Sequence, residues 1–258
     1  MNARLHQMFS LEGRIALVTG SSGGIGFALA RALASAGATV VVNGRDTGKV
    51  ETAVAALTGE GLEAFGAAFD VTDPDEVAQA IAWVEAEVGA IDVLVNNAGI
   101  QRRAPLEEFE PKVWRELMAT NLDAVFYVGQ AVARSMIPRG RGCIINIASV
   151  QSELARANIA PYTASKGAVK MLTKGMATDW GKHGLRVNAI APGYFRTELN
   201  KALIADEKFN DWLINRTPMR RWADVGELEG AAVFLASDAS SFVHGHVLYV
   251  DGGITACL

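Results

Sequence analysis

Short apolar runs rich in β-branched residues alternate with longer stretches of helical periodicity along most of the chain. The runs are nearly continuous in apolar character, which is typical of strands buried on both faces of a sheet. The strands expected from this pattern cover residues 15–19, 39–43, 64–69, 93–96, 143–147, 185–190 and 247–250. The pattern therefore predicts a core of buried strands separated by helices.

Helical periodicity fills most of the segments between these strands. Helices are expected over residues 25–36, 47–60, 74–88, 112–136, 161–182 and 225–236, whereas 191–221 looks irregular with one helical piece. End signals support these bounds, because Gly37 ends the first helix, Asp73 precedes Pro74, and Asp224 precedes the last helix. Alternating strands and helices predict an α/β fold, a single doubly wound (Rossmann) domain over residues 1–258. Such folds bind ligands beyond the carboxyl ends of their strands, and residues 191–221 are the expected substrate loop region.

Composition and charge narrow the function classes. The 258 residues are half hydrophobic, and 28 acidic against 24 basic side chains give a net charge of −4, which argues against a nucleic-acid partner. We expect a cytoplasmic protein without a membrane partner, since the N-terminus lacks the apolar core of a signal peptide and no apolar run spans a bilayer. Cys143 and Cys257 are expected to be free thiols, and no residue spacing predicts a metal site.

A glycine-rich turn, Thr-Gly-Ser-Ser-Gly-Gly-Ile-Gly over residues 19–26, joins the first strand to the first helix. Glycine allows a tight turn and lets a pyrophosphate approach backbone N–H groups at the positive end of a helix. The glycine spacing at Gly20, Gly24 and Gly26 differs from the G-x-G-x-x-G fingerprint, so a purely structural turn is the alternative. The position of the turn after the first strand favours a dinucleotide site.

The end of the second strand bears on which dinucleotide fits. An acidic residue there would hold a ribose 2′-hydroxyl, whereas an arginine would accept a 2′-phosphate. This chain has Arg45 there, followed by Asp46, which would repel a phosphate if it pointed inward. We predict NADP(H) as the preferred cofactor with NAD(H) as the second choice, an exposed loop arginine being the alternative interpretation.

Three side chains predict acid–base chemistry. Tyr162 and Lys166 are four residues apart at the start of a helix and so share a face. A nearby cation favours the phenolate, so the pKa of Tyr162 is expected to fall toward the usable range. Ser149 follows the fifth strand, thirteen residues upstream of Tyr162, so both hydroxyls are expected in one crevice. Asn121, inside the long helix, would be read as an amide satisfied by the backbone if it stood alone.

Together these motifs resemble the short-chain dehydrogenase/reductase family. The matching segments, in an order and spacing that extend from about Leu11 to Gly253, are Thr19-Gly-x-x-x-Gly-Ile-Gly26, Asp70-Val71, Asn96-Asn-Ala-Gly99, Asn121, Ser149, Tyr162-x-x-x-Lys166 and Pro192-Gly193. The resemblance implies a nicotinamide-dependent oxidoreductase. A catalytically inactive dinucleotide sensor of the same fold is the alternative, which an incomplete Ser/Tyr/Lys set would have favoured.

The resemblance also implies roles. Tyr162 exchanges the proton, Lys166 lowers its pKa and holds the nicotinamide ribose, Ser149 hydrogen-bonds the reacting oxygen, and Asn121 anchors a water that leads to Lys166. The implied cofactor residues are Gly20, Ser22, Gly24, Ile25, Gly26, Arg45, Asp70, Val71, Asn97, Ala98, Gly99, Tyr162, Lys166, Pro192, Gly193, Phe195 and Thr197. One departure is Gly23, where many NADP-using relatives carry a basic residue, which leaves Arg45 to set the preference almost alone.

Residues 97–105, 149–155 and 176–181 further resemble members of the family that interconvert D-gluconate and 5-keto-D-gluconate. The implied substrate is a small sugar acid, and the alternatives are another polyol or a 3-oxoacyl thioester. Arg102 and Arg103 follow Gly99, and adjacent side chains point apart, so we predict that Arg103 alone grips the carboxylate. The alternative is that both are solvated. The other expected substrate contacts are Ser149, Gln151, Glu153 and Tyr162.

The chain from residue 247 to 258 remains apolar to its end. Free tails are usually polar, so we expect this one to be buried against a partner subunit. The family resemblance implies a homotetramer with twofold axes.

Overall fold

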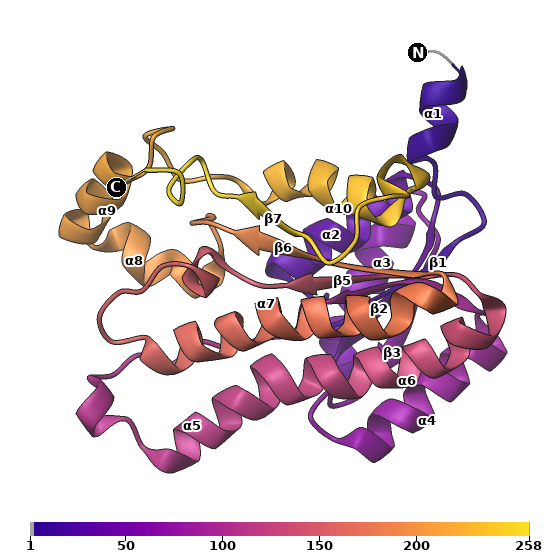
Figure 1. Cartoon of the computed structure of the whole chain (residues 1–258), viewed down its shortest axis with the longest axis horizontal. Helices are drawn as coiled ribbons and strands as arrows, with labels where there is room; N and C mark the ends of the chain where they lie inside the picture. Colours follow the sequence, from indigo (N-terminus) through magenta and orange to yellow (C-terminus); the bar gives the residue numbers. More distant parts are fainter. Residues whose placement is uncertain (1–2, 258) are drawn as a thin grey trace.

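A seven-stranded sheet in the order β3-β2-β1-β4-β5-β6-β7 runs through the computed structural model, which describes residues 3–257 (Figure 1). Every neighbouring pair is parallel. The strands are β1 Ile15–Val18, β2 Thr39–Gly44, β3 Ala64–Ala68, β4 Ile91–Asn96, β5 Gly142–Ile147, β6 Leu185–Pro192 and β7 Val247–Val250. The strand order reverses at β1 and β4, so the expected doubly wound α/β fold is confirmed, with its switch point between these strands.

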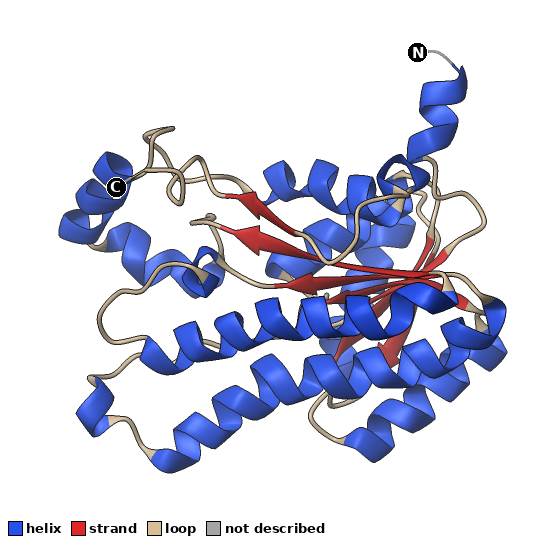
Figure 2. Ribbon diagram, in the orientation of Figure 1, coloured by secondary structure: helices blue, strands red, loops and turns tan. Residues whose placement is uncertain are grey.

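Two layers of helices cover the sheet. One face carries α2 Gly24–Ser35, α3 Thr47–Gly59 and α10 Glu229–Ala236, and the other carries α4 Pro74–Glu87, α6 Ala124–Arg139 and α7 Ala160–Trp180. The arrowheads of β5, β6 and β7 point to the side of the molecule where α8 Lys201–Ala205 and α9 Glu207–Arg216 lie (Figure 2). Parallel strands therefore end together at one edge, beneath α8 and α9.

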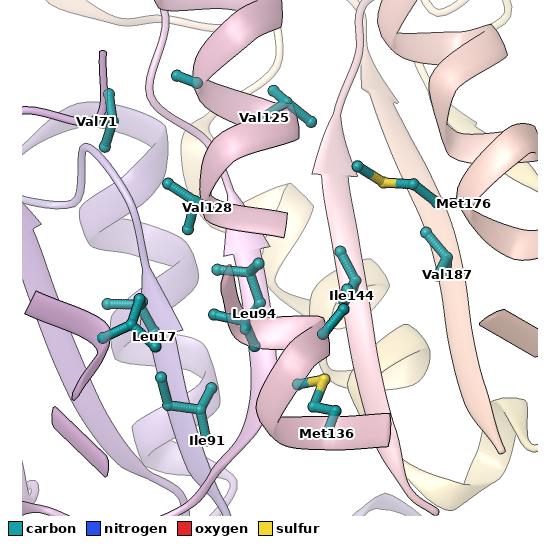
Figure 3. Packing of buried hydrophobic residues seen from close by; sticks show 14 of the residues in the cluster. Leu17, Val71, Ile91, Leu94, Val125, Val128, Met136, Ile144, Met176 and Val187 are labelled. Carbon is teal, nitrogen blue, oxygen red and sulfur yellow. The ribbon is translucent and has the colours of Figure 1, made fainter. Parts of the chain in front are cut away.

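The continuous apolar runs are explained by burial on both faces. Leu17 packs in the cluster under α4, α6 and α7, while the next residue, Val18, packs in the cluster under α2, α3 and α10. Figure 3 shows Leu17, Leu94 and Ile144, from three adjacent strands, with Met136 of α6 on the same face. Successive strand side chains point to opposite faces, so both must be apolar.

The prediction of a single helix over residues 112–136 is wrong, because the segment is divided. The structure has α5 Pro111–Met118, a π-helical turn Ala119–Asp123, and then α6. The turn holds Asn121, whose buried side-chain amide bonds the backbone of Ile100 on a neighbouring loop. A local periodicity cannot reveal this widening, because the contact that accompanies it is tertiary.

Other departures are smaller. Residues 191–221 hold two helices rather than one, because the Asp206 side chain accepts a hydrogen bond from Phe209 N and caps α9 separately from α8. The helix expected from Val225 begins as a 3₁₀ turn, Val225–Leu228. Helix α1, Ala3–Phe9, is not predicted by the sequence analysis and has no buried residue. Asp73 caps α4 as expected.

Two further findings concern the cysteines and the length of the apolar helices. Cys143 and Cys257 are both free thiols, as expected. Within residues 3–257, no helix is both long and apolar enough to cross a membrane.

Candidate active site

A cavity of about 460 Å³ opens at the carboxyl ends of the strands, within the range typical of small-molecule sites. It extends from the glycine-rich turn, past the loops after β2, β4 and β5, to the segment after β6. All the predicted cofactor residues line it: Gly20, Ser22, Gly24, Ile25, Gly26, Arg45, Asp70, Val71, Asn97, Ala98, Gly99, Tyr162, Lys166, Pro192, Gly193, Phe195 and Thr197.

The glycine-rich turn forms a cradle that fits a pyrophosphate. Gly20 and Gly24 have positive φ angles of +60° and +57°, and a Cβ on Gly26 would lie 2.4 Å from both Asn97 Nδ2 and Gly20 O. Gly23 precedes α2 without a side-chain cap, and a Cβ there would meet nothing within 4 Å. The first residues of α2, from Gly24 to Gly26, line the cavity, and the N-terminus of a helix favours an anion.

Neighbouring strand ends hold this turn in place. Thr19 Oγ1 accepts hydrogen bonds from the backbone N–H groups of Asn97 and Ala98, at 2.9 and 3.1 Å. Asn97 Nδ2 donates back to Thr19 O and Gly20 O. The buried Asn43 side chain accepts from Gly20 N at 3.1 Å. The loops after β1, β2 and β4 are thus locked together around the cradle.

Arg45 lies at the predicted 2′-phosphate position. Its side chain lines the cavity, is 74% exposed, and has Nη1 3.6 Å from Asp70 Oδ2. Asp46 instead accepts a hydrogen bond from Lys49 N and caps α3. The carboxylate that would have repelled a phosphate is therefore held at the helix end.

Tyr162, Ser149 and Lys166 meet in the middle of the cavity. The Ser149 hydroxyl hydrogen-bonds the Tyr162 phenol. Lys166 lies one turn further along α7, with Nζ 5.8 Å from the centre of the Tyr162 ring, and donates a hydrogen bond to Ile147 O at 2.6 Å. The expected triad is assembled on the end of β5 and the first turns of α7.

The expected direction of the Tyr162 shift is wrong in this structure. Burial raises the pKa of Tyr162, and the hydrogen bond from Ser149 and the charge of Arg103 offset this only in part. Burial also lowers the pKa of Lys166 to about 8. Both groups are thus pushed toward their neutral forms, because a low-dielectric site disfavours either charge.

Asn121 lies beside the cavity lining rather than within it. Its side chain accepts from Ile100 N at 2.8 Å and donates to Ile100 O and Ser165 Oγ. Ser165 Oγ in turn donates to Tyr162 O. The amide therefore positions both the loop after β4 and the start of α7. The predicted water between Asn121 and Lys166 remains a prediction.

Four of the five predicted substrate residues, Arg103, Ser149, Gln151 and Tyr162, line the cavity, and Glu153 does not. Arg102, which was expected to point away from Arg103, pairs with Glu116 on the surface at 2.7 Å.

Glu153 is not among the described lining residues. It forms an ion pair with Lys170 of α7 and accepts a hydrogen bond from the Tyr249 hydroxyl at 2.9 Å. Its carboxylate is turned toward α7 and β7, because a complementary cation and hydroxyl lie on that side.

Several residues that line the cavity were not predicted from the sequence. Arg156 and Tyr194 lie at the substrate end, together with Gln101. The signal for Arg156 was available, since it is a cation on the same loop as Ser149, seven residues further on. Tyr194 lies between two residues expected to bind the cofactor, Gly193 and Phe195, but nothing local marks its hydroxyl as a cavity group.

Known proteins match nearly the whole chain. The family described as "Enoyl-(Acyl carrier protein) reductase" matches residues 20–255. The chain is 64% identical over 251 residues to a gluconate 5-dehydrogenase of Gluconobacter oxydans (strain 621H), covering 97% of this chain and 98% of that protein. It is 53% identical over 250 residues to a 5-keto-D-gluconate 5-reductase of Escherichia coli (strain K12), with the same coverage.

A solved structure is also highly similar to this chain in sequence and fold. It is a gluconate 5-dehydrogenase from Burkholderia cenocepacia J2315 in complex with NADP and tartrate, 59% identical, with a TM-score of 0.97. The match covers 98% of this chain and 100% of that one.

Proposed function

Since the chain belongs to the short-chain dehydrogenase/reductase family of oxidoreductases, we propose that it transfers a hydride between NADP(H) and a sugar acid, interconverting D-gluconate and 5-keto-D-gluconate. The observation that carries this proposal is the layout of one cavity. A phosphate cradle lies at one end, Tyr162 with Ser149 in the middle, and Arg103 at the other end. A substrate with its carboxylate near Arg103 and its reacting carbon near Tyr162 suits that layout.

The chain's own residues supply the proton chemistry. Bound NADP(H) would supply or accept the hydride. Tyr162 Oη gives its proton to the ketone oxygen during reduction and takes it back during oxidation. Ser149 Oγ hydrogen-bonds the same oxygen and orients it. Because burial raises the pKa of Tyr162, the phenol is held in its acid form at neutral pH, ready for reduction.

The cofactor preference rests on Arg45. A guanidinium makes charge-assisted bonds to a phosphate, and Asp46 is engaged as the cap of α3. The Burkholderia cenocepacia relative was solved with NADP, which supports the proposal for this chain.

Initial rates test the function directly. Reduction of 5-keto-D-gluconate and oxidation of D-gluconate are measured with NADP(H) and NAD(H), beside galactitol and a 3-oxoacyl thioester. The sugar acid pair should give the highest kcat/KM, with NADP(H) ahead of NAD(H). Turnover confined to galactitol or to the thioester would reject the substrate assignment.

The cofactor assignment is tested by Arg45→Ala. This variant should weaken NADPH binding at least about tenfold, the scale of 1.4 kcal/mol, and NADH binding much less. Lys49→Ala, one turn into α3, is the matched control for losing a nearby cation. Equal losses for both dinucleotides would show that Arg45 does not read the 2′-phosphate.

Two proposals concern the protein as a whole. A cytoplasmic location is supported by the two free thiols, Cys143 and Cys257, because disulfides are rare in reducing compartments. A homotetramer is supported by large apolar side chains left exposed on one helical layer, Trp83 on α4 and Phe126 on α6.

A further inference from the structure

Two guanidinium groups reach the substrate end of the cavity from different loops. Arg103 follows β4, and Arg156 lies between the 3₁₀ turn Val150–Ser152 and α7. Their charges act on each other, since burial and the charge of Arg156 both lower the pKa of Arg103. No ion pair of either side chain with an acid exists within the described residues.

The acidic residues on the cavity wall are engaged elsewhere. Asp70 pairs with Arg45 at the adenine end, and the highly exposed Glu198 pairs with Lys201. Two neighbouring cations without a protein anion repel each other, and partial removal from water makes this costlier. An anionic ligand between the two guanidinium groups would attract both of them and offset their mutual repulsion.

Arg156 is held for such a contact. Its Cζ lies 5.1 Å from the ring centre of Phe209 of α9, and its guanidinium lies beside the Tyr194 hydroxyl. Its Nε is buried without a hydrogen-bond partner. Stacking on an aromatic ring fixes the plane of the guanidinium fork, which suits recognition of a planar carboxylate.

The wall around Arg156 also carries unpartnered acceptors. The side-chain oxygens Oε1 of Gln101 and Gln151 are buried without hydrogen bonds, and both residues line the cavity. Buried polar atoms are almost always hydrogen-bonded in folded proteins. The hydroxyls of a polyol chain would satisfy such acceptors next to the two cations.

We propose that Arg156 binds the substrate carboxylate jointly with Arg103 and thereby sets the preference for acids over neutral polyols. This inference rests on the proposed function and names a specificity residue for it. Phe209 acts as a positioning residue, since it touches Arg156 and not the acid. Its ring also packs against Tyr194, with centres 5.8 Å apart, so occupancy of the acid site is linked to α9.

The test uses the full-length variants Arg156→Gln and Arg103→Gln with NADPH. Each should reduce kcat/KM for 5-keto-D-gluconate at least about tenfold, the scale of 1.4 kcal/mol, and change it much less for L-sorbose, an uncharged ketose. Arg102→Gln is the matched control, because the same loop carries it but its guanidinium pairs outward with Glu116. NADPH affinity should stay at the wild-type value in all three variants, which reports intact folding.

A binding measurement separates recognition from turnover. D-Gluconate cannot react with NADPH, so calorimetric titration of the NADPH-loaded enzyme measures acid binding alone. Arg156→Gln should weaken D-gluconate at least about tenfold, with D-sorbitol affected much less. Phe209→Leu should raise KM for 5-keto-D-gluconate while leaving kcat near wild type.

The outcomes distinguish the inference from the proposed function. If wild type reduces 5-keto-D-gluconate and Arg156→Gln matches it, the inference is wrong and the function stands. If Arg156→Gln lowered kcat/KM and affinity equally for acidic and uncharged ligands, Arg156 would have only a structural role beside Tyr194, and the inference would be overturned. If wild type does not turn over the sugar acid, the proposed function fails, and the D-gluconate titration still decides whether Arg156 holds an acid.

Discussion

The half-buried Tyr162 lies beside the buried Lys166, and loss of water around them acts on their two pKa values in opposite directions. It raises the pKa of Tyr162 and lowers the pKa of Lys166 to about 8. In the proposed function, the protein therefore places a protonated phenol next to the reacting oxygen. It holds Lys166 where the amine loses its charge more easily than it does in water.

Replacing Tyr162 with Phe removes the proton donor and preserves the ring. Turnover should fall by roughly 10²–10⁴, the usual contribution of a positioned acid–base group. Dinucleotide affinity should be nearly unchanged. Steady-state rates and a fluorescence titration with NADPH measure the two effects, and near-normal rates in this variant would exclude Tyr162 as the proton donor.

The depressed pKa of Lys166 predicts a pH-dependent stability. Between about pH 8 and 10.5 the unfolded chain binds a proton at this lysine that the folded chain has lost, so folding gains stability as pH rises. The free energy of unfolding of the wild type should therefore rise, relative to that of Lys166→Met, by up to about 3 kcal/mol across this range.

Urea denaturation at pH 7.5 and pH 10 measures that difference, with the exposed Lys49→Met as control. A stability difference that stays constant between the two pH values would contradict the assignment. Lys166→Met should also abolish turnover, because the ribose contact implied by the family resemblance is lost with the amine.

Among the elements, the glycine-rich turn before α2 leaves no room for a side chain at Gly26. A methyl group on Gly26 would overlap Asn97 Nδ2 and Gly20 O, each 2.4 Å away. Gly26→Ala should cost about 1–3 kcal/mol of stability, as overpacked sites do. It should also weaken NADPH binding at least about tenfold, since the cradle must shift.

Thermal unfolding and NADPH titration measure these losses. Gly23→Ala is the matched control for stability, because the same turn carries it and its added methyl meets nothing within 4 Å. The steric argument would be refuted if the two variants unfolded at the same temperature.

At the scale of the whole molecule, large apolar side chains are exposed on several elements, and three of them lie on the helical layer formed by α4, α5 and α6. Trp83 of α4, Trp114 of α5 and Phe126 of α6 are 45%, 39% and 43% exposed. Exposed apolar groups on adjoining helices mark interaction sites. We expect a homotetramer with a mass of four times the 27.4 kDa of one chain.

Light scattering coupled to size exclusion gives the mass of the assembly. Phe126→Glu should lower this mass, because a charge would be buried in the contact between subunits. Leu106→Glu, at a 62% exposed residue outside this layer, is the control. A monomer mass for wild type would refute the assembly.

The sequence alone was sufficient for the strand and helix order and for most of the site. The signals are local: continuous apolar runs, the cap at Asp73, and motifs at the carboxyl ends of successive strands, which parallel topology brings to one edge. The motif residues between Gly20 and Thr197 therefore line one cavity, because parallel topology brings the ends of successive strands to the same edge.

Only the tertiary structure decided features that depend on partners remote in sequence. The π turn at Asn121 accompanies a bond to Ile100, and Glu153 turns away from the cavity toward Lys170. Arg156 becomes a cavity cation by stacking on Phe209, fifty-three residues away. The rise in the Tyr162 pKa follows from burial, which a sequence motif does not encode because desolvation is set by everything packed around the phenol.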